Sequence, residues 1–148
     1  MQRTAILLLL GLAALVACSR STQPPVGRWI GHYEAPDVMV DVRLEITNNG
    51  AVRASAPDLL DVGQVSDQDR AAMHARLAAD LAASWDDATP RAMDFDGRVF
   101  RKPGGIAPQM MWNPDTKQMN LIFYFGTKHS ISIPMQAVED FHNDPWSG

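Results

Sequence analysis

Apolar and polar residues alternate along much of the chain. The clearest example is residues 38–46, where every second residue from Val38 to Ile46 is aliphatic and three of the four between them are charged. A period of two is typical of a β-strand whose two faces meet different surroundings. Shorter stretches have the same character, and the sequence predicts about eight strands, over residues 26–34, 38–46, 51–54, 92–95, 98–100, 109–113, 119–125 and 129–133.

Turn residues separate most of these strands. Asn48-Asn49-Gly50, Asp96-Gly97 and Asn113-Pro114-Asp115-Thr116 each favour a tight hairpin, and Asp96-Gly97 is typical of a two-residue type I′ turn. Residues 57–65 have no clear period and are predicted to form a loop, and Pro134 is expected to end the last strand. Sequential strands joined by tight turns favour an antiparallel meander, and closing it into a barrel would protect its edges.

One helix is predicted between the two groups of strands, over residues 66–85. Ser66 can cap its first turn, and Asp69 three residues later forms a variant of the capping box. Residues at steps of four form an apolar stripe, which we expect to pack on the sheet: Met73, Leu77, Leu81 and Trp85. Arg70 and His74 are expected to be solvated. The predicted class is therefore mainly β with one inserted helix (α+β).

The N-terminus has the pattern of an export signal. A short positive start precedes residues 5–17, which are uncharged and almost wholly apolar. Thirteen helical residues reach about 20 Å, less than the roughly 30 Å hydrocarbon core of a bilayer, which disfavours a permanent span. The run ends in Leu15-Val16-Ala17-Cys18, which resembles the lipobox of bacterial lipoproteins. The resemblance implies that residues 1–17 are removed as a signal peptide and that Cys18 is acylated, with palmitate among its chains.

The same resemblance implies a location for the mature protein. Ser19 follows the cysteine where enteric lipoproteins retained at the inner membrane have Asp, so the outer membrane is expected, with the domain facing the periplasm. Residues 18–25 would form a lipidated tether and residues 26–148 a single β-rich domain. The alternative is an ordinary secretory peptide with an unmodified Cys18. A single cysteine cannot form an internal disulfide, which favours the lipid anchor.

The length and charge of the chain limit the kinds of partner that it can bind. With 148 residues the chain has room for one small domain. The formal net charge is -4, and the 13 basic residues are dispersed. Nucleic-acid binding needs a concentrated basic face, so we expect no nucleic-acid partner. The bacterial membrane, reached through acylated Cys18, is the partner that the sequence predicts most directly.

A second, shorter resemblance lies in the first strand. Gly27-Arg28-Trp29 resembles the Gly-x-Trp signature of lipocalins and their calycin relatives. In that family the tryptophan closes one end of a β-barrel. The resemblance therefore implies a lipocalin-like barrel, with Trp29 as its plug, and a protein that carries a small ligand.

The sequence contains no recognisable catalytic or metal motif. No serine lies in a Gly-x-Ser-x-Gly elbow, and neither His-Glu-x-x-His nor Cys-x-x-Cys occurs. We therefore predict no catalytic residue, no metal ligand and no cofactor. One possibility stays open: His32 and Glu34 share a strand face, and a barrel can bring His129 beside them to form a polar-ligand or metal patch. With Tyr124, these are the candidate ligand-binding residues.

The expected function follows from the lipobox, the predicted meander and the missing catalytic motifs. We expect an outer-membrane-anchored lipoprotein whose non-catalytic domain binds an envelope protein or an apolar small molecule. Two alternatives stay open. One is a lipocalin-type carrier of a small ligand, and the other is an uncharacterised periplasmic hydrolase.

Overall fold

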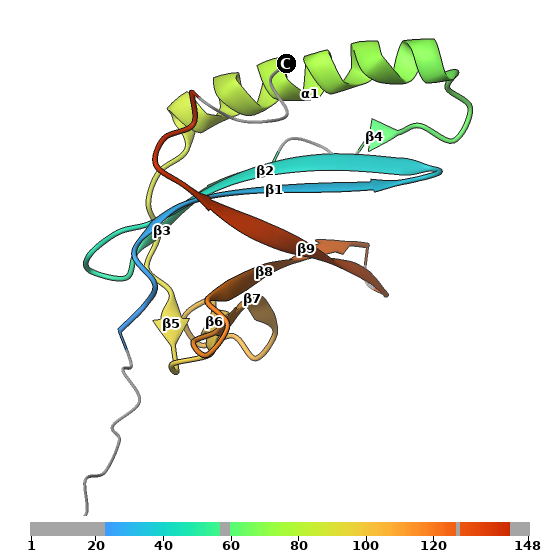
Figure 1. Ribbon diagram of the computed structural model, residues 1–148. Coiled ribbons are helices and arrows are strands. Elements are labelled where there is room, and N and C mark those ends of the chain that lie inside the picture. The colour runs from blue at the N-terminus through green and yellow to red at the C-terminus, as the bar shows by residue number, and fades with distance from the viewer. Residues whose placement is uncertain (1–22, 57–59, 127, 143–148) are drawn as a thin grey trace, which may run out of the picture.

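The alternating stretches of the sequence form one curled antiparallel sheet, shown in Figure 1. The computed structural model describes residues 23–56, 60–126 and 128–142. In these residues nine strands and one helix confirm the predicted mainly β class with an inserted helix. The elements are β1 (Gly27–Ala35), β2 (Val38–Ile46), β3 (Val52–Ser55), β4 (Leu60–Asp61), α1 (Asp67–Asp87), β5 (Asp94–Phe95), β6 (Val99–Arg101), β7 (Pro108–Asn113), β8 (Gln118–Phe125) and β9 (His129–Val138).

The sheet consists of two meanders that meet at β1 and β9. Its strand order is β3-β2-β1-β9-β8-β7-β6-β5, and β4 pairs with the start of β2. The sheet curls into a half-barrel, and its two ends approach each other where Val52 of β3 pairs with Arg91. The two residues exchange both backbone hydrogen bonds, each 2.8 Å long. This bridge links the β3 edge to the segment that enters β5.

The concave face of the sheet carries the main core. Side chains from both meanders fill it: Trp29, Val40, Val42, Leu44, Ile46, Val52, Phe100, Met110, Met119, Ile133 and Met135. The ring of Trp29 meets Trp112 edge-on, with 5.7 Å between the ring centroids. At Gly31 a Cβ atom would lie 2.8 Å from the Ile133 side chain and closer still to Met135. A glycine is needed there because these side chains lie directly over β1.

Helix α1 begins and packs much as its sequence predicts. Ser66 accepts a hydrogen bond from the Asp69 amide at 3.2 Å and donates one to the Asp69 carboxylate at 2.6 Å. Leu77 and Leu81 are buried, which confirms that this stripe packs on the sheet. A second small core of Met39, Val62 and Leu77 joins α1 to β2. The helix ends at Asp87, two residues after the predicted end at 85.

Three local predictions are wrong. The predicted loop 57–65 contains β4, which is too short to show a period but pairs with β2. Pro134 does not end the last strand: pairing with β1 begins only at Met135, so Pro134 lies at an edge of β9 on that side, where no N–H is required. The turn at Asp96-Gly97 is not type I′, because Gly97 has a positive φ but Asp96 does not. The Asp96 carboxylate instead accepts hydrogen bonds from the amides of Arg98 and Val99.

Candidate functional site

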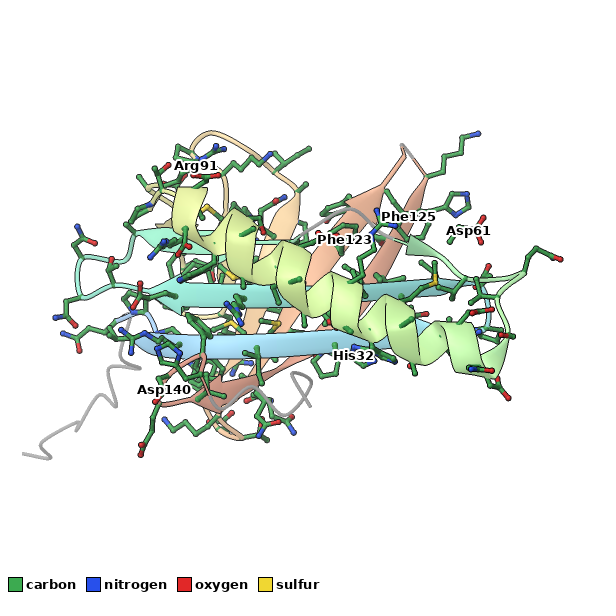
Figure 2. The ribbon with its side chains drawn as sticks, turned by 90° about the horizontal axis from the view of Figure 1, so that it is seen from above. His32, Asp61, Arg91, Phe123, Phe125 and Asp140 are labelled. Carbon is green, nitrogen blue, oxygen red and sulfur yellow. The ribbon has the colours of Figure 1, made fainter. Side chains whose placement is uncertain are left out.

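Polar side chains lie between α1 and the convex face of the β1–β2 hairpin. In the register of these strands His32 lies opposite Asp41, so their side chains share this face. Glu34 lies two residues further along β1 and points the same way. Asp41 is only 2% exposed, because α1 covers a face of β2 that alternation alone would leave to solvent. Figure 2 shows α1 crossing over β1 and β2 near His32.

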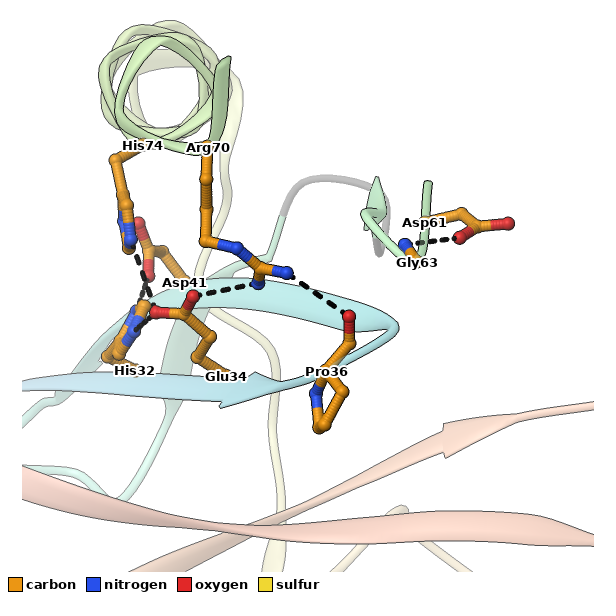
Figure 3. A network of polar contacts seen from close by, with 8 residues as sticks. All are labelled: His32, Glu34, Pro36, Asp41, Asp61, Gly63, Arg70 and His74. Carbon is orange, nitrogen blue, oxygen red and sulfur yellow. Dashed lines mark hydrogen bonds and ion pairs between the residues drawn. The ribbon is translucent and has the colours of Figure 1, made fainter. Parts of the chain in front are cut away.

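The helix adds two further polar groups to this face, as Figure 3 shows. Arg70 and His74 are four residues apart on α1, so they project from the same side of successive turns. Arg70 donates hydrogen bonds to Glu34 at 2.9 Å and to the carbonyl of Pro36 at 3.1 Å. His74 Nε2 lies 3.2 Å from the second carboxylate oxygen of Glu34. We call His32, Glu34, Asp41, Arg70 and His74 the interlayer cluster.

His32 is the most enclosed histidine of the cluster. Its Nδ1 atom is hydrogen-bonded to Asp41, and 13% of its side chain is exposed. The hydrogen bond to Asp41 raises the pKa of His32 above its ordinary value, burial opposes this rise, and the charge of Asp41 and contacts with Glu34 add to it. Its other ring nitrogen, Nε2, lies 3.5 Å from Glu34 Oε2. The side chain of His32 thus joins a buried carboxylate to a more accessible one.

Glu34 is the point where the strands and the helix meet. Burial raises the pKa of its carboxyl group, but the hydrogen bond from Arg70, the charge of His74 and the hydrogen bond from His32 outweigh that effect and lower the pKa overall. Its side chain is 32% exposed, similar to the 31% of His74. Solvent therefore reaches this side of the cluster, whereas Asp41 is enclosed.

Three members of the cluster have the residue types and positions to hold a metal ion. One ligand atom from each of His32, Glu34 and His74 lies within 4.8 Å of the other two. Two imidazoles and a carboxylate are a common set of protein ligands for zinc and for non-haem iron.

The structure brings together only two of the four predicted ligand-binding residues. His32 and Glu34 belong to the cluster, whereas Tyr124 lies on β8, with its hydroxyl donating to the carbonyl of Pro108 at 2.7 Å. His129 lies on β9 and stacks on Phe125, with 5.8 Å between the ring centroids. Figure 2 shows Phe125 on the opposite side of α1 from His32. Strand β9 does pair with β1, but through residues 135–138. His129 lies at the other end of β9 and does not belong to the same cluster as His32.

The prediction that Arg70 and His74 are solvated holds only in part, because both side chains are partly exposed but also face the sheet. Both contact Glu34, and only 22% of the Arg70 side chain is exposed. A signal for this was present in the sequence: Arg70 and His74 are seven residues before Leu77 and Leu81, on the same helical face. On β2, which α1 covers, the polar residues Asp41 and Arg43 alternate with aliphatic residues. The helix and the strand therefore each have a polar surface that can pair with the other.

A second polar region lies at the other end of the helix. No basic residue occurs in the last turn of α1, and Arg53 of β3 occupies that place instead. Its guanidinium donates to the carbonyls of Trp85 and Ala88 and lies 4.2 Å from the centroid of the Trp85 ring. A cation there suits the negative end of the helix dipole. A hollow of about 510 Å³ adjoins these residues and is lined also by Arg28 and Arg43.

Comparison with known proteins assigns no family or function to the chain. No protein-family model, curated protein or solved structure matched the chain. In the described ranges, no helix is both long and apolar enough to cross a bilayer.

Proposed function

We propose that this protein is a lipoprotein of the bacterial envelope, anchored in the outer membrane through acylated Cys18 and facing the periplasm, whose β-rich domain binds a partner protein of the envelope. One observation carries the proposal: the motif Leu15-Val16-Ala17-Cys18 lies at the end of the uncharged apolar run of residues 5–17. These residues lie outside the part that the structure describes. Several acyl chains provide stable anchoring, at about 0.8 kcal/mol per buried CH₂ group.

The packing of the concave face supports a protein partner rather than an apolar small ligand. A carrier of the lipocalin type holds its ligand inside the barrel. Here the concave face is filled by buried side chains such as Phe100, Met110 and Met119. On the meander that α1 does not cover, the exposed large apolar side chains are those of Ile106, Met111 and Tyr124, which a partner protein could contact.

Mass spectrometry of the protein isolated from a bacterial host tests the anchor. The expected mature chain begins at Cys18 and carries diacylglycerol and a further acyl chain. Cys18→Ala should leave the chain unprocessed and unacylated, whereas Val26→Ala, beyond the tether, should change neither. Recovery of a chain with an unmodified cysteine would contradict the proposal.

Fractionation of the envelope tests the location. The wild-type protein should co-sediment with the outer membrane, and Ser19→Asp should move it to the inner membrane. Recovery of the wild-type protein in the inner-membrane or soluble fraction would contradict the assignment.

The two alternatives each have a distinct readout. Saturable binding of a fluorescent fatty-acid analogue by the purified protein would favour the carrier. Turnover of ester or peptide substrates that is lost in Glu34→Gln would favour the hydrolase. The proposal predicts neither result.

A further inference from the structure

We infer that His32, Glu34 and His74 form a binding site for a divalent transition-metal ion, with Zn²⁺ as the best fit, and that Asp41 orients His32 in it. This inference goes beyond the proposed function and does not depend on the lipid anchor. It rests on the geometry of the interlayer cluster.

Two of the three separations between ligand atoms match those of a tetrahedral ion. At bond lengths of about 2.0–2.2 Å, two ligands of tetrahedral zinc lie about 3.4 Å apart. In the cluster, Glu34 Oε2 lies 3.5 Å from His32 Nε2 and 3.2 Å from His74 Nε2. The ligand atoms of the two imidazoles lie within 4.8 Å of each other, so binding one ion requires the rings to adjust around the Glu34 carboxylate.

The partners behind these ligands also fit a metal site. A histidine that binds metal through one ring nitrogen commonly donates its other N–H to a carboxylate, which fixes the tautomer and the ring orientation. Asp41 holds Nδ1 of His32 in this way, which directs Nε2 toward Glu34. Arg70 binds Oε1 of Glu34, so Oε2 is the oxygen that faces both imidazoles.

The site is held between two elements of the fold and is open to solvent on one side. The ligands come from β1 and from α1, so an ion would join the helix to the sheet. Glu34 and His74 are each about one-third exposed, which gives an ion a path from solvent. Three protein ligands leave the fourth position of zinc to water or to a group from a ligand or partner.

Calorimetric titration tests the inference. The sample is the full-length protein without a polyhistidine tag, purified in detergent and freed of metal with EDTA. We expect ZnCl₂ to bind at one ion per chain and MgCl₂ to give no heat, because Mg²⁺ prefers oxygen ligands. Zinc should also raise the Tm, since a ligand that binds only the folded state stabilises it. Absence of saturable zinc binding would overturn the inference.

Four variants locate the ion. Glu34→Gln and His74→Gln should weaken zinc binding by more than about 100-fold, because loss of an outer partner alone costs about 10–100-fold. Asp41→Asn should weaken it by about 10–100-fold and keep one ion per chain. His129→Gln, remote from the cluster, should bind as the wild type does.

Two controls separate loss of the zinc site from unfolding and from binding at Cys18. Circular dichroism should show that each variant has the wild-type fold, so that lost affinity is not unfolding. Cys18→Ser should bind zinc unchanged, because residue 18 contributes none of the three ligands. Binding that depends on Cys18, or that persists in a Glu34→Gln/His74→Gln double variant, would overturn the inference.

Discussion

The two faces of the β1–β2 hairpin are both covered, but by different chemistry. The concave face contributes Val40, Val42 and Leu44 to an apolar core, in which an apolar side chain of similar volume can replace another. The convex face buries Asp41 under α1, and this burial is tolerated because His32 satisfies the carboxylate. The concave face is thus specified by volume alone, whereas the convex face combines a small apolar core around Met39 with particular polar pairs.

The largest expected effect is on the concave face. Trp29→Ala should lower the free energy of unfolding by about 3–5 kcal/mol, because the ring is 6% exposed and its removal leaves a cavity. Urea unfolding of the metal-free protein measures the loss. Ile106→Ala is the control, since Ile106 is 93% exposed and its truncation should cost less than about 0.5 kcal/mol. A loss below about 1 kcal/mol for Trp29→Ala would show that the core assignment is wrong.

A smaller effect is expected on the convex face. Asp41→Asn keeps the shape of the side chain but removes the charge that His32 faces, and should cost about 1–3 kcal/mol. The same unfolding measurement applies. Arg76→Ala, which removes an exposed pair with Asp80 on the outer side of α1, should cost less than about 0.5 kcal/mol. Equal losses in the two variants would contradict the distinction between buried and exposed pairs.

The smallest effect is the dependence of stability on pH in the metal-free protein. Since the folded-state pKa of His32 is raised, its contribution is complete below the unfolded value of about 6.5 and is lost as the pH rises through the folded pKa. Asp41 on β2, Glu34 on β1, and Arg70 and His74 on α1 face this ring. Unfolding free energies measured from pH 6 upward should therefore fall more steeply for the wild type than for Asp41→Asn. Parallel pH profiles would contradict this cause.

The sequence predicts the concave face better than the convex face, for a physical reason. A period of two in Val38–Ile46 and capping by Ser66 are local signals, so the strand and the start of the helix are correctly predicted. The interlayer cluster depends on which strand face α1 covers, and residues 32, 41 and 74 become neighbours only through that packing. Periodicity therefore marks His32 and Glu34 as sharing a face, but it does not identify His74 as their partner.

The proposed zinc site lies between α1 and the convex face of the β1–β2 hairpin. Anomalous diffraction from zinc-loaded crystals would show whether an ion binds there. The expected result is one ion between β1 and α1, with His32 Nε2, His74 Nε2 and a Glu34 oxygen each at about 2.0–2.2 Å. Zinc bound only by other residues, with the interlayer cluster still joined by its own ion pairs, would contradict the claim.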